Sequence, residues 1–150
     1  MLLLKKDYLL GKINKFMDSL IKTILLNAKN IAIIGASSDP LKESFIVMKY
    51  LQEKGFKVIP INSKTSNTLI LGEKVYKNIN EIKIDIDIVN IFRPSNEIVD
   101  LVNRIIKNNV KTVWLQLEIF CSESEKKLNK LGINFIQNKC TKIEYEKIIL

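Results

Sequence analysis

Small and hydroxyl-bearing residues follow the first strongly apolar run of the chain. They are Gly35, Ala36, Ser37 and Ser38. A loop of small residues between a buried strand and a helix lets backbone N–H groups approach a phosphate, and the two serines add hydroxyl donors. The loop lacks both the GxGxxG dinucleotide fingerprint and the GK[ST] ending of a P-loop. Small residues also make tight strand-to-helix turns, so this alternative stays open.

Two further polar segments come directly after apolar runs. Asn62 and Lys64 lie where a nicotinamide enzyme usually carries an acidic residue for the ribose hydroxyls. Asn62 can hydrogen-bond a sugar and Lys64 can meet a phosphate; the alternative is an ordinary polar turn. Phe92, Arg93 and Pro94 end the third run. The Arg93 guanidinium can hold a phosphate in two directions, and the alternative is an ion pair with a neighbouring acid.

Four other side chains are considered as possible ligand contacts. Gln116 ends the fourth apolar run and can donate to or accept from a ligand, whereas Trp114 on the same strand face is expected in the core. Cys140 follows the fifth run. Its thiol would be reactive only with a lowered pKa, and a buried, inert cysteine is the more frequent case. Arg104 lies in the middle of a predicted helix, where we expect it to be exposed.

Composition excludes several classes of chemistry. The chain has no histidine, which rules out Ser-His-Asp and Cys-His catalysis, histidine-bound metal and a phosphohistidine. Its two cysteines form no CxxC pair, which argues against a structural zinc. The net charge of +8 comes from lysines spread along the chain, which favours a solvated surface over a nucleic-acid stripe. Lys5 and Lys6 interrupt the apolar start, so we expect no signal peptide, no membrane association and a cytoplasmic protein.

Apolar periodicity places these segments on alternating strands and helices. Short β-branched runs predict strands at residues 30–35, 56–61, 87–92, 112–116 and 133–136. Helical spacing predicts helices at residues 13–26, 44–54, 95–108 and 122–131, with a last helical turn from 141. Gly11 indicates a break before the first helix, Ser122 an N-cap, and Gly55 and Gly132 helix ends.

The alternation predicts an α/β fold. Parallel strands need crossover connections, so we expect a three-layer, doubly wound, mostly parallel five-stranded Rossmann-like sheet with helices on both faces. The length of 150 residues suits one such domain at residues 30–150, preceded by an extension with a leading helix at residues 1–29. Ligands of these sheets bind beyond the carboxyl ends of the strands, where the candidate residues lie.

Taken together and in their order along the chain, these segments resemble a known family, the small stand-alone CoA-binding domain proteins. Their fold is similar to the N-terminal CoA-binding domain of the succinyl-CoA synthetase α subunit. The matching segments are IIGASSDP at 33–40, Tyr50-Leu51, GFKVIPIN at 55–62, GEKVY at 72–76, DIVNIFR at 87–93, VWLQL at 113–117, and Cys140. The resemblance covers residues 14–146.

The resemblance implies coenzyme A as the ligand. By the family pattern the diphosphate lies on the loop from Gly35 to Ser38. Asn62 and Lys64 lie near the ribose and its phosphate, and Phe92, Arg93 and Gln116 line the adjoining rim. The sequence departs from this pattern where Glu118 replaces the usual glycine, which removes a position of close backbone approach and adds a negative charge. Asn138-Lys139 replaces Asp-Arg, Glu43 stands where proline is common, and Ser63 replaces the proline of an Asn-Pro pair.

The function expected from this resemblance is binding of CoA or an acyl-CoA without catalysis. No general base of the ordinary type converges on the predicted rim, and the histidine needed for ligase-type phosphotransfer is absent. The alternatives are a regulatory or partner-binding module that has lost CoA affinity, thiol exchange at Cys140, and a disfavoured NAD(P)-type oxidoreductase. A protein partner or a second copy of the chain stays open.

Overall fold

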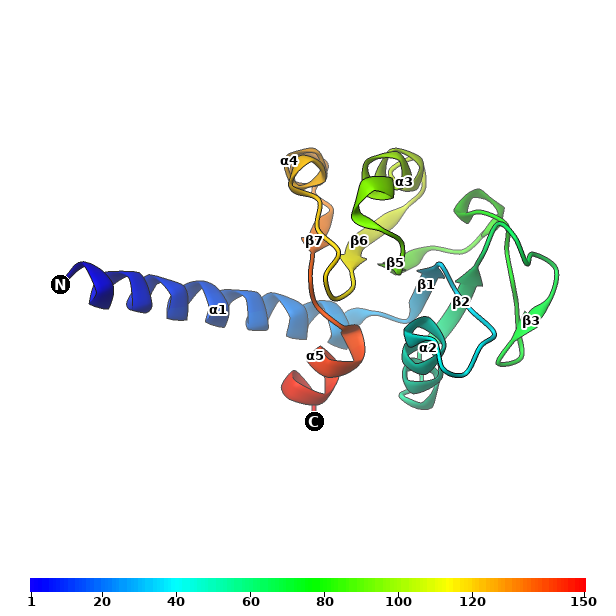
Figure 1. The fold of residues 1–150 in the computed structure, drawn as a ribbon, viewed down its shortest axis with the longest axis horizontal. Helices are drawn as coiled ribbons and strands as arrows, with labels where there is room; N and C mark the ends of the chain where they lie inside the picture. Colours follow the sequence, from blue (N-terminus) through cyan, green and yellow to red (C-terminus); the bar gives the residue numbers. More distant parts are fainter.

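The computed structural model describes residues 1–150 and contains one five-stranded parallel sheet (Figure 1). The strand order is β2-β1-β5-β6-β7. The strands are β1 (Asn30–Ile34), β2 (Lys57–Ile61), β5 (Ile86–Ile91), β6 (Val110–Leu115) and β7 (Asn134–Ile136). The chain winds outward from β1 to β2, returns to β5 on the other side of β1, and winds outward again. The predicted α/β fold is therefore confirmed, and the strand order reverses between β1 and β5.

Helices cover both faces of the sheet (Figure 1). One face carries α1 (Leu2–Asn27), α2 (Glu43–Glu53) and α5 (Thr141–Ile148), and the other carries α3 (Ile98–Ile105) and α4 (Ser122–Lys130). Side chains alternate along β1, so Ile31 and Ile33 pack in the first core while Ala32 and Ile34 pack in the second. A strand buried on both faces needs the continuous apolar run that the sequence shows.

The first helix corrects an expectation. No break occurs at Gly11, because α1 runs without interruption from Leu2 to Asn27. A glycine inside a helix costs only about 0.5–1 kcal/mol relative to alanine, so the leucines and lysines around it keep the helix continuous. The last turns of α1 pack on the domain through Ile21, Ile24 and Leu25, while its first turns extend away from it (Figure 1). No helix of the structure is both long and apolar enough to span a bilayer.

Other boundaries differ from the predicted ones. The expected helix at 95–108 is a 3₁₀ turn, η2 (Ser95–Glu97), followed by the shorter α3. Ser122 is the first residue of α4, and Cys121 rather than Ser122 occupies the N-cap position. The tail forms a helix of eight residues instead of one turn. The connection from β2 to β5 adds a small hairpin and a 3₁₀ turn: β3 (Leu69–Ile70), β4 (Glu73–Lys74) and η1 (Ile79–Glu81).

The junction between α1 and β1 is held by one buried carboxylate. Asp87 Oδ2 accepts the backbone N–H groups of Lys29 and Asn30 at 2.8 and 2.9 Å. Its Oδ1 accepts Lys111 Nζ at 2.9 Å. Burial raises the pKa of this carboxyl, but the hydrogen bonds outweigh burial and hold the pKa below its usual value. Asp87 therefore fixes the start of the central strand in its ionised form.

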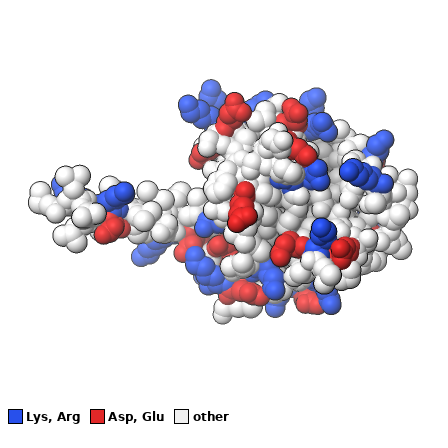
Figure 2. All heavy atoms as spheres, in the orientation of Figure 1, with Lys and Arg blue, Asp and Glu red and all other residues white.

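Charged side chains are interspersed on the surface. Figure 2 shows lysines and arginines distributed over the visible face with acidic residues among them. This agrees with the spread of lysines along the sequence.

Candidate functional site

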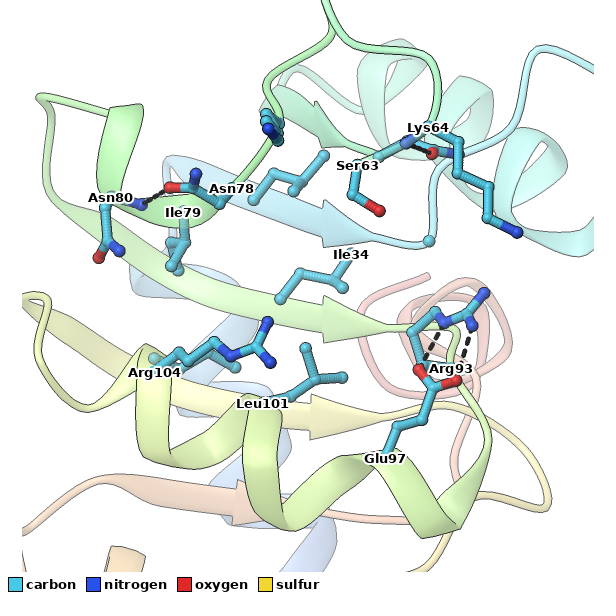
Figure 3. Close-up of a pocket in the computed structure, with 15 residues that line it drawn as sticks. Ile34, Ser63, Lys64, Asn78, Ile79, Asn80, Arg93, Glu97, Leu101 and Arg104 are labelled. Atoms are coloured by element: carbon cyan, nitrogen blue, oxygen red, sulfur yellow. Dashed lines mark hydrogen bonds and ion pairs between the residues drawn. The ribbon is translucent and has the colours of Figure 1, made fainter.

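A groove of about 240 Å³ lies at the carboxyl ends of β1 and β2, beside α3 (Figure 3). Four predicted site residues line this groove, namely Gly35, Asn62, Lys64 and Arg93. The structure adds residues that the sequence analysis did not select: Ser63, Lys77, Asn78, Asn80, Glu97 and Arg104. The groove has four cationic side chains and one carboxylate, so its field favours an anion.

Gly35 stands where the strand order reverses, and it allows two loops to meet. Its φ is +86°, and a Cβ at this position would lie 2.7 Å from the carbonyl oxygen of Phe92 and 3.1 Å from Cδ of Arg93. Only glycine takes this backbone conformation freely and leaves room for the neighbouring carbonyl. Gly35 therefore sets the distance between the loops after β1 and β5, and with it the position of Arg93.

The small-residue loop after β1 offers fewer amides to a ligand than its composition suggests. The N–H groups of Gly35 and Ala36 both donate to the carbonyl oxygen of Ile61, at 3.1 and 3.2 Å. The N–H groups of Ser37 and Ser38 make no hydrogen bond within the chain. The amides free to bind a phosphate are therefore those of the two serines. Their side chains, like that of Ala36, lie outside the groove.

Asn62 connects the loops after β1 and β2. Its Nδ2 donates to the carbonyl oxygen of Ala36 at 2.8 Å, and its Oδ1 accepts the N–H of Lys64 at 2.8 Å. Both ends of the amide are engaged, so Asn62 holds the loops in place. Lys64 makes no ion pair and faces the groove.

Arg93 forms an ion pair with Glu97, which is the alternative to phosphate binding that its sequence position allows. Its Nε and Nη2 atoms donate to the two carboxylate oxygens of Glu97 at 2.8 and 2.7 Å (Figure 3). These hydrogen bonds raise the pKa of Arg93 and lower that of Glu97. About 40% of each side chain stays exposed, so the pair is accessible from the groove. Binding of a ligand phosphate by Arg93 stays a prediction.

Arg104 belongs to the groove, although the sequence analysis treated it only as an exposed helical residue. It is exposed and makes no ion pair, and it lines the groove from α3 together with Leu101 (Figure 3). Glu97, Leu101 and Arg104 are spaced by four and three residues, so they share one face of the helical segment. This spacing is the signal in the sequence that could have identified Arg104.

A second hollow, of about 350 Å³, lies on the other side of Arg93. Its walls contain the predicted residues Phe92, Arg93, Pro94 and Gln116, with Glu43, Leu117, Ile119 and Cys140. Gln116 is buried, and its side chain accepts the N–H of Thr141 at 3.3 Å and donates to the Thr141 hydroxyl at 3.4 Å. Cys140 is also buried. Arg93 therefore stands between a cationic groove and a more apolar hollow.

The loop after β6 shows what the departure at Glu118 does. Glu118 has φ +66°, a left-handed conformation that glycine takes without strain. Its N–H donates to Asn138 Oδ1 at 2.9 Å. Asn138 is itself left-handed, with φ +54°, which asparagine tolerates better than most residues. The two substituted positions are thus in contact and hold two rim loops together.

Comparison with known proteins decides the family. The family model of the CoA binding domain matches residues 29–146. The chain belongs to the CoA binding domain family. The uncharacterized Bacillus subtilis protein YneT is 31% identical over 125 residues, which covers 83% of this chain and 91% of that protein. The match to the α subunit of an ADP-forming acetate–CoA ligase of Pyrococcus furiosus is 36% identical over 93 residues, 59% of this chain and 20% of the subunit.

Solved structures confirm the fold of the CoA binding domain. The Thermus thermophilus protein cell-free ID.343 superposes with a TM-score of 0.84 at 30% identity and covers 87% of this chain and 98% of that structure. The resemblance to CoA-binding domain proteins is confirmed by the family match. The family match begins at residue 29, so α1 lies outside it.

Proposed function

We propose that this CoA binding domain protein binds coenzyme A or an acyl-CoA across both hollows and has no catalysis of its own. The observation that carries the proposal is the position of Arg93 between a cationic groove and an apolar hollow. Coenzyme A has the matching polarity, with phosphates at its nucleotide end and a long, weakly polar arm that ends in a thiol.

The nucleotide end fits the groove. Lys64, Lys77 and Arg104 have no ion-pair partners, and Arg93 adds a guanidinium whose second Nη group is not engaged by Glu97. The free amides of Ser37 and Ser38 lie on the loop that follows β1, next to Gly35. Charge-assisted hydrogen bonds to phosphate are about twice as strong as neutral ones, so these groups supply most of the expected affinity.

The arm fits the hollow beyond Arg93. Phe92, Leu117 and Ile119 offer apolar contacts there, and Cys140 forms part of the wall. The groove and the hollow hold about 240 and 350 Å³, and ligand sites usually hold about 300–1,000 Å³. Only the combined volume of the groove and the hollow approaches the middle of that range. A ligand that fills both must be long, which favours coenzyme A over a mononucleotide.

The proposed absence of catalysis is supported by the state of Glu97, the one carboxylate that lines the groove. Glu97 is ionised and bound through both oxygens to Arg93, so it holds no proton to donate and is poorly placed to accept one. The chain has no histidine to take this role. The hollow that takes the arm is lined by one carboxylate, Glu43, and one buried thiol, Cys140. We propose that neither acts on the arm, so incubation with acetyl-CoA should release no free thiol above the buffer rate.

The test is calorimetric and thermal-shift titration with CoA, dephospho-CoA, pantetheine and NADH. At a hundredfold excess over the dissociation constant, a bound ligand stabilises the fold by about 2.7 kcal/mol. Arg104→Ala should weaken CoA binding by about tenfold, because one charge-assisted hydrogen bond contributes about 1.5 kcal/mol. Lys107→Ala is the matched control, an exposed cation three residues further along that does not line the groove.

Three results would contradict the proposal. If CoA leaves the melting temperature unchanged, the domain does not bind it. If NADH stabilises the protein and CoA does not, the groove serves a nicotinamide nucleotide instead. Equal weakening by Arg104→Ala and Lys107→Ala would show that only the overall charge matters and that the groove is not the binding site.

A further inference from the structure

The projecting part of α1 carries a continuous apolar surface. We call it the α1 stripe and define it by six side chains: Leu2, Leu3, Leu9, Leu10, Ile13 and Phe16. All six are exposed, from 54% for Leu10 to 89% for Leu2. Figure 2 shows this part of the molecule extending from the body with much of its surface uncharged. Apolar residues on a helix of a soluble protein normally face a partner.

The helix itself needs such a partner. Residues 2–16 make no packing contact with either core of the domain. An isolated helix of about 12–15 residues is marginal in water, and Gly11 weakens this one further. Most helical stability in proteins comes from packing of an apolar face. A covering surface would therefore stabilise both the stripe and the helix that carries it.

The spacing of the stripe specifies a helical partner. Leu2, Leu9, Ile13 and Phe16 follow one another by seven, four and three residues, and Leu20 continues the series by four. This is the a/d spacing of a coiled coil. Leu3 and Leu10 widen the seam to the three-sevenths face typical of packed helices. Lys6 occupies the one core position that is not apolar.

Lys6 determines which helix fits. We propose that α1 pairs antiparallel with α1 of a second copy of this chain. In the register that centres on residue 11, Leu2 faces the partner's Leu20, Leu9 faces the partner's Ile13, and Lys6 lies over the ring of the partner's Phe16. That last contact is a cation–π pair. A parallel pair would instead place Lys6 against the partner's Lys6, and the two like charges would repel each other. A single lysine at a core position therefore selects the antiparallel register, as single polar core residues commonly do in coiled coils.

The buried area is sufficient for a dimer. The six side chains expose about two thirds of their surface on average. With roughly 100 Å² for an aliphatic and 200 Å² for an aromatic side chain, two stripes remove about 1,000 Å² of apolar surface from water. A specific interface needs about 1,000 Å² in total, and the polar neighbours of the stripe add to this value. The two-fold arrangement is closed, so it forms a dimer rather than a fibre.

The oligomeric state of the 150-residue chain and of three variants of it, measured by analytical ultracentrifugation, tests the pair. The wild type should be a dimer. Ile13→Glu buries two carboxylates at the centre of the seam and should weaken the dimer by about a hundredfold or more. Phe16→Glu should weaken it far less, because the introduced carboxylate faces the partner's Lys6. Lys15→Glu changes charge on the opposite side of the helix and should leave the dimer intact.

Cross-linking and salt dependence separate this pair from other occupants. A disulfide should form when Leu2→Cys and Leu20→Cys proteins are mixed and in neither protein alone, because residues 2 of the two copies lie about 27 Å apart in this register. Lys5 and Lys12 flank the seam in both copies and repel one another across it. Salt should therefore strengthen the dimer, because it screens this repulsion. A monomeric wild type, a higher oligomer, or equal loss for Phe16→Glu and Ile13→Glu would overturn the proposal. A wild type that stays monomeric but sediments with anionic phosphatidylserine vesicles would assign the stripe to a lipid surface instead.

Discussion

Replacement of Gly35 by alanine tests the geometry on which the whole site depends. The new Cβ would lie 2.7 Å from the carbonyl oxygen of Phe92, in a backbone conformation with φ +86°. The conformation alone costs a residue with a side chain about 1–2 kcal/mol. The contact is shorter than real Cβ atoms show, and relief of such overpacking costs typically about 1–3 kcal/mol more.

The expected loss is therefore about 2–5 kcal/mol, or about 5–15 °C in the melting temperature of a domain of this size. The chain supplies a matched control in Gly55, which has φ +94° and no atom within 4 Å of the position that a Cβ would take. Gly55→Ala bears the conformational cost alone, so we expect a loss of about 1–2 kcal/mol. Urea unfolding of both variants gives the two free energies on the same protein.

The difference between the two variants isolates the contact with Phe92. Because the neighbouring Arg93 Cδ lies only 3.1 Å from the same Cβ position, relief of the clash also moves Arg93. We expect Gly35→Ala to weaken CoA binding and Gly55→Ala to leave it unchanged. Equal losses of stability in the two variants would refute the reasoning, since the loops would then separate at no cost.

Two further predictions concern strain and pH. Glu118→Gly should stabilise the fold by about 1 kcal/mol in urea unfolding, because glycine adopts φ +66° without strain, and an unchanged or lower stability would contradict this account. Asp87 has a lowered pKa in the folded state, so its contribution to stability is complete above the unfolded-state pKa of about 3.9 and is lost as the pH falls through the folded-state value. Unfolding experiments between about pH 3 and pH 7 should show the stability gap between wild type and Asp87→Asn closing on the acid side, whereas a constant gap would exclude an ionised Asp87 as the anchor.

The sequence predicted the sheet because the signals for it are local. A strand buried on both faces requires a short run of β-branched residues, and five such runs lie at the correct spacing. Helix ends were less reliable. Gly55 and Gly132 end their helices with positive φ as expected, but Gly11 interrupts nothing. A glycine ends a helix where the chain turns, and the chain does not turn at residue 11, because α1 continues to Asn27.

The candidate site was only partly predictable. Residues that follow strands were found, because parallel strands end at a common edge. The hydrogen-bond partners of these residues were not predicted. The N–H groups of Gly35 and Ala36 donate to the carbonyl oxygen of Ile61. The side-chain amide of Asn62 donates to the carbonyl oxygen of Ala36 and accepts the N–H of Lys64. A sequence shows which donors exist, whereas only the packed loops show which donors stay free.

By itself, the sequence determined the α/β class, the order of strands and helices, the absence of histidine and the edge of the sheet at which the candidate residues gather. Each of these depends on residue type or on patterns within about ten residues of chain. The tertiary structure decided that Arg93 pairs with Glu97, that Arg104 and Lys77 reach the same groove, and that the α1 stripe extends beyond the domain. The meeting of Arg104 and Lys77 depends on how the crossovers place segments that lie far apart in the chain, and no local pattern encodes that placement. The Arg93–Glu97 pair spans only four residues, but the sequence alone leaves open whether Arg93 binds a neighbouring acid or a ligand.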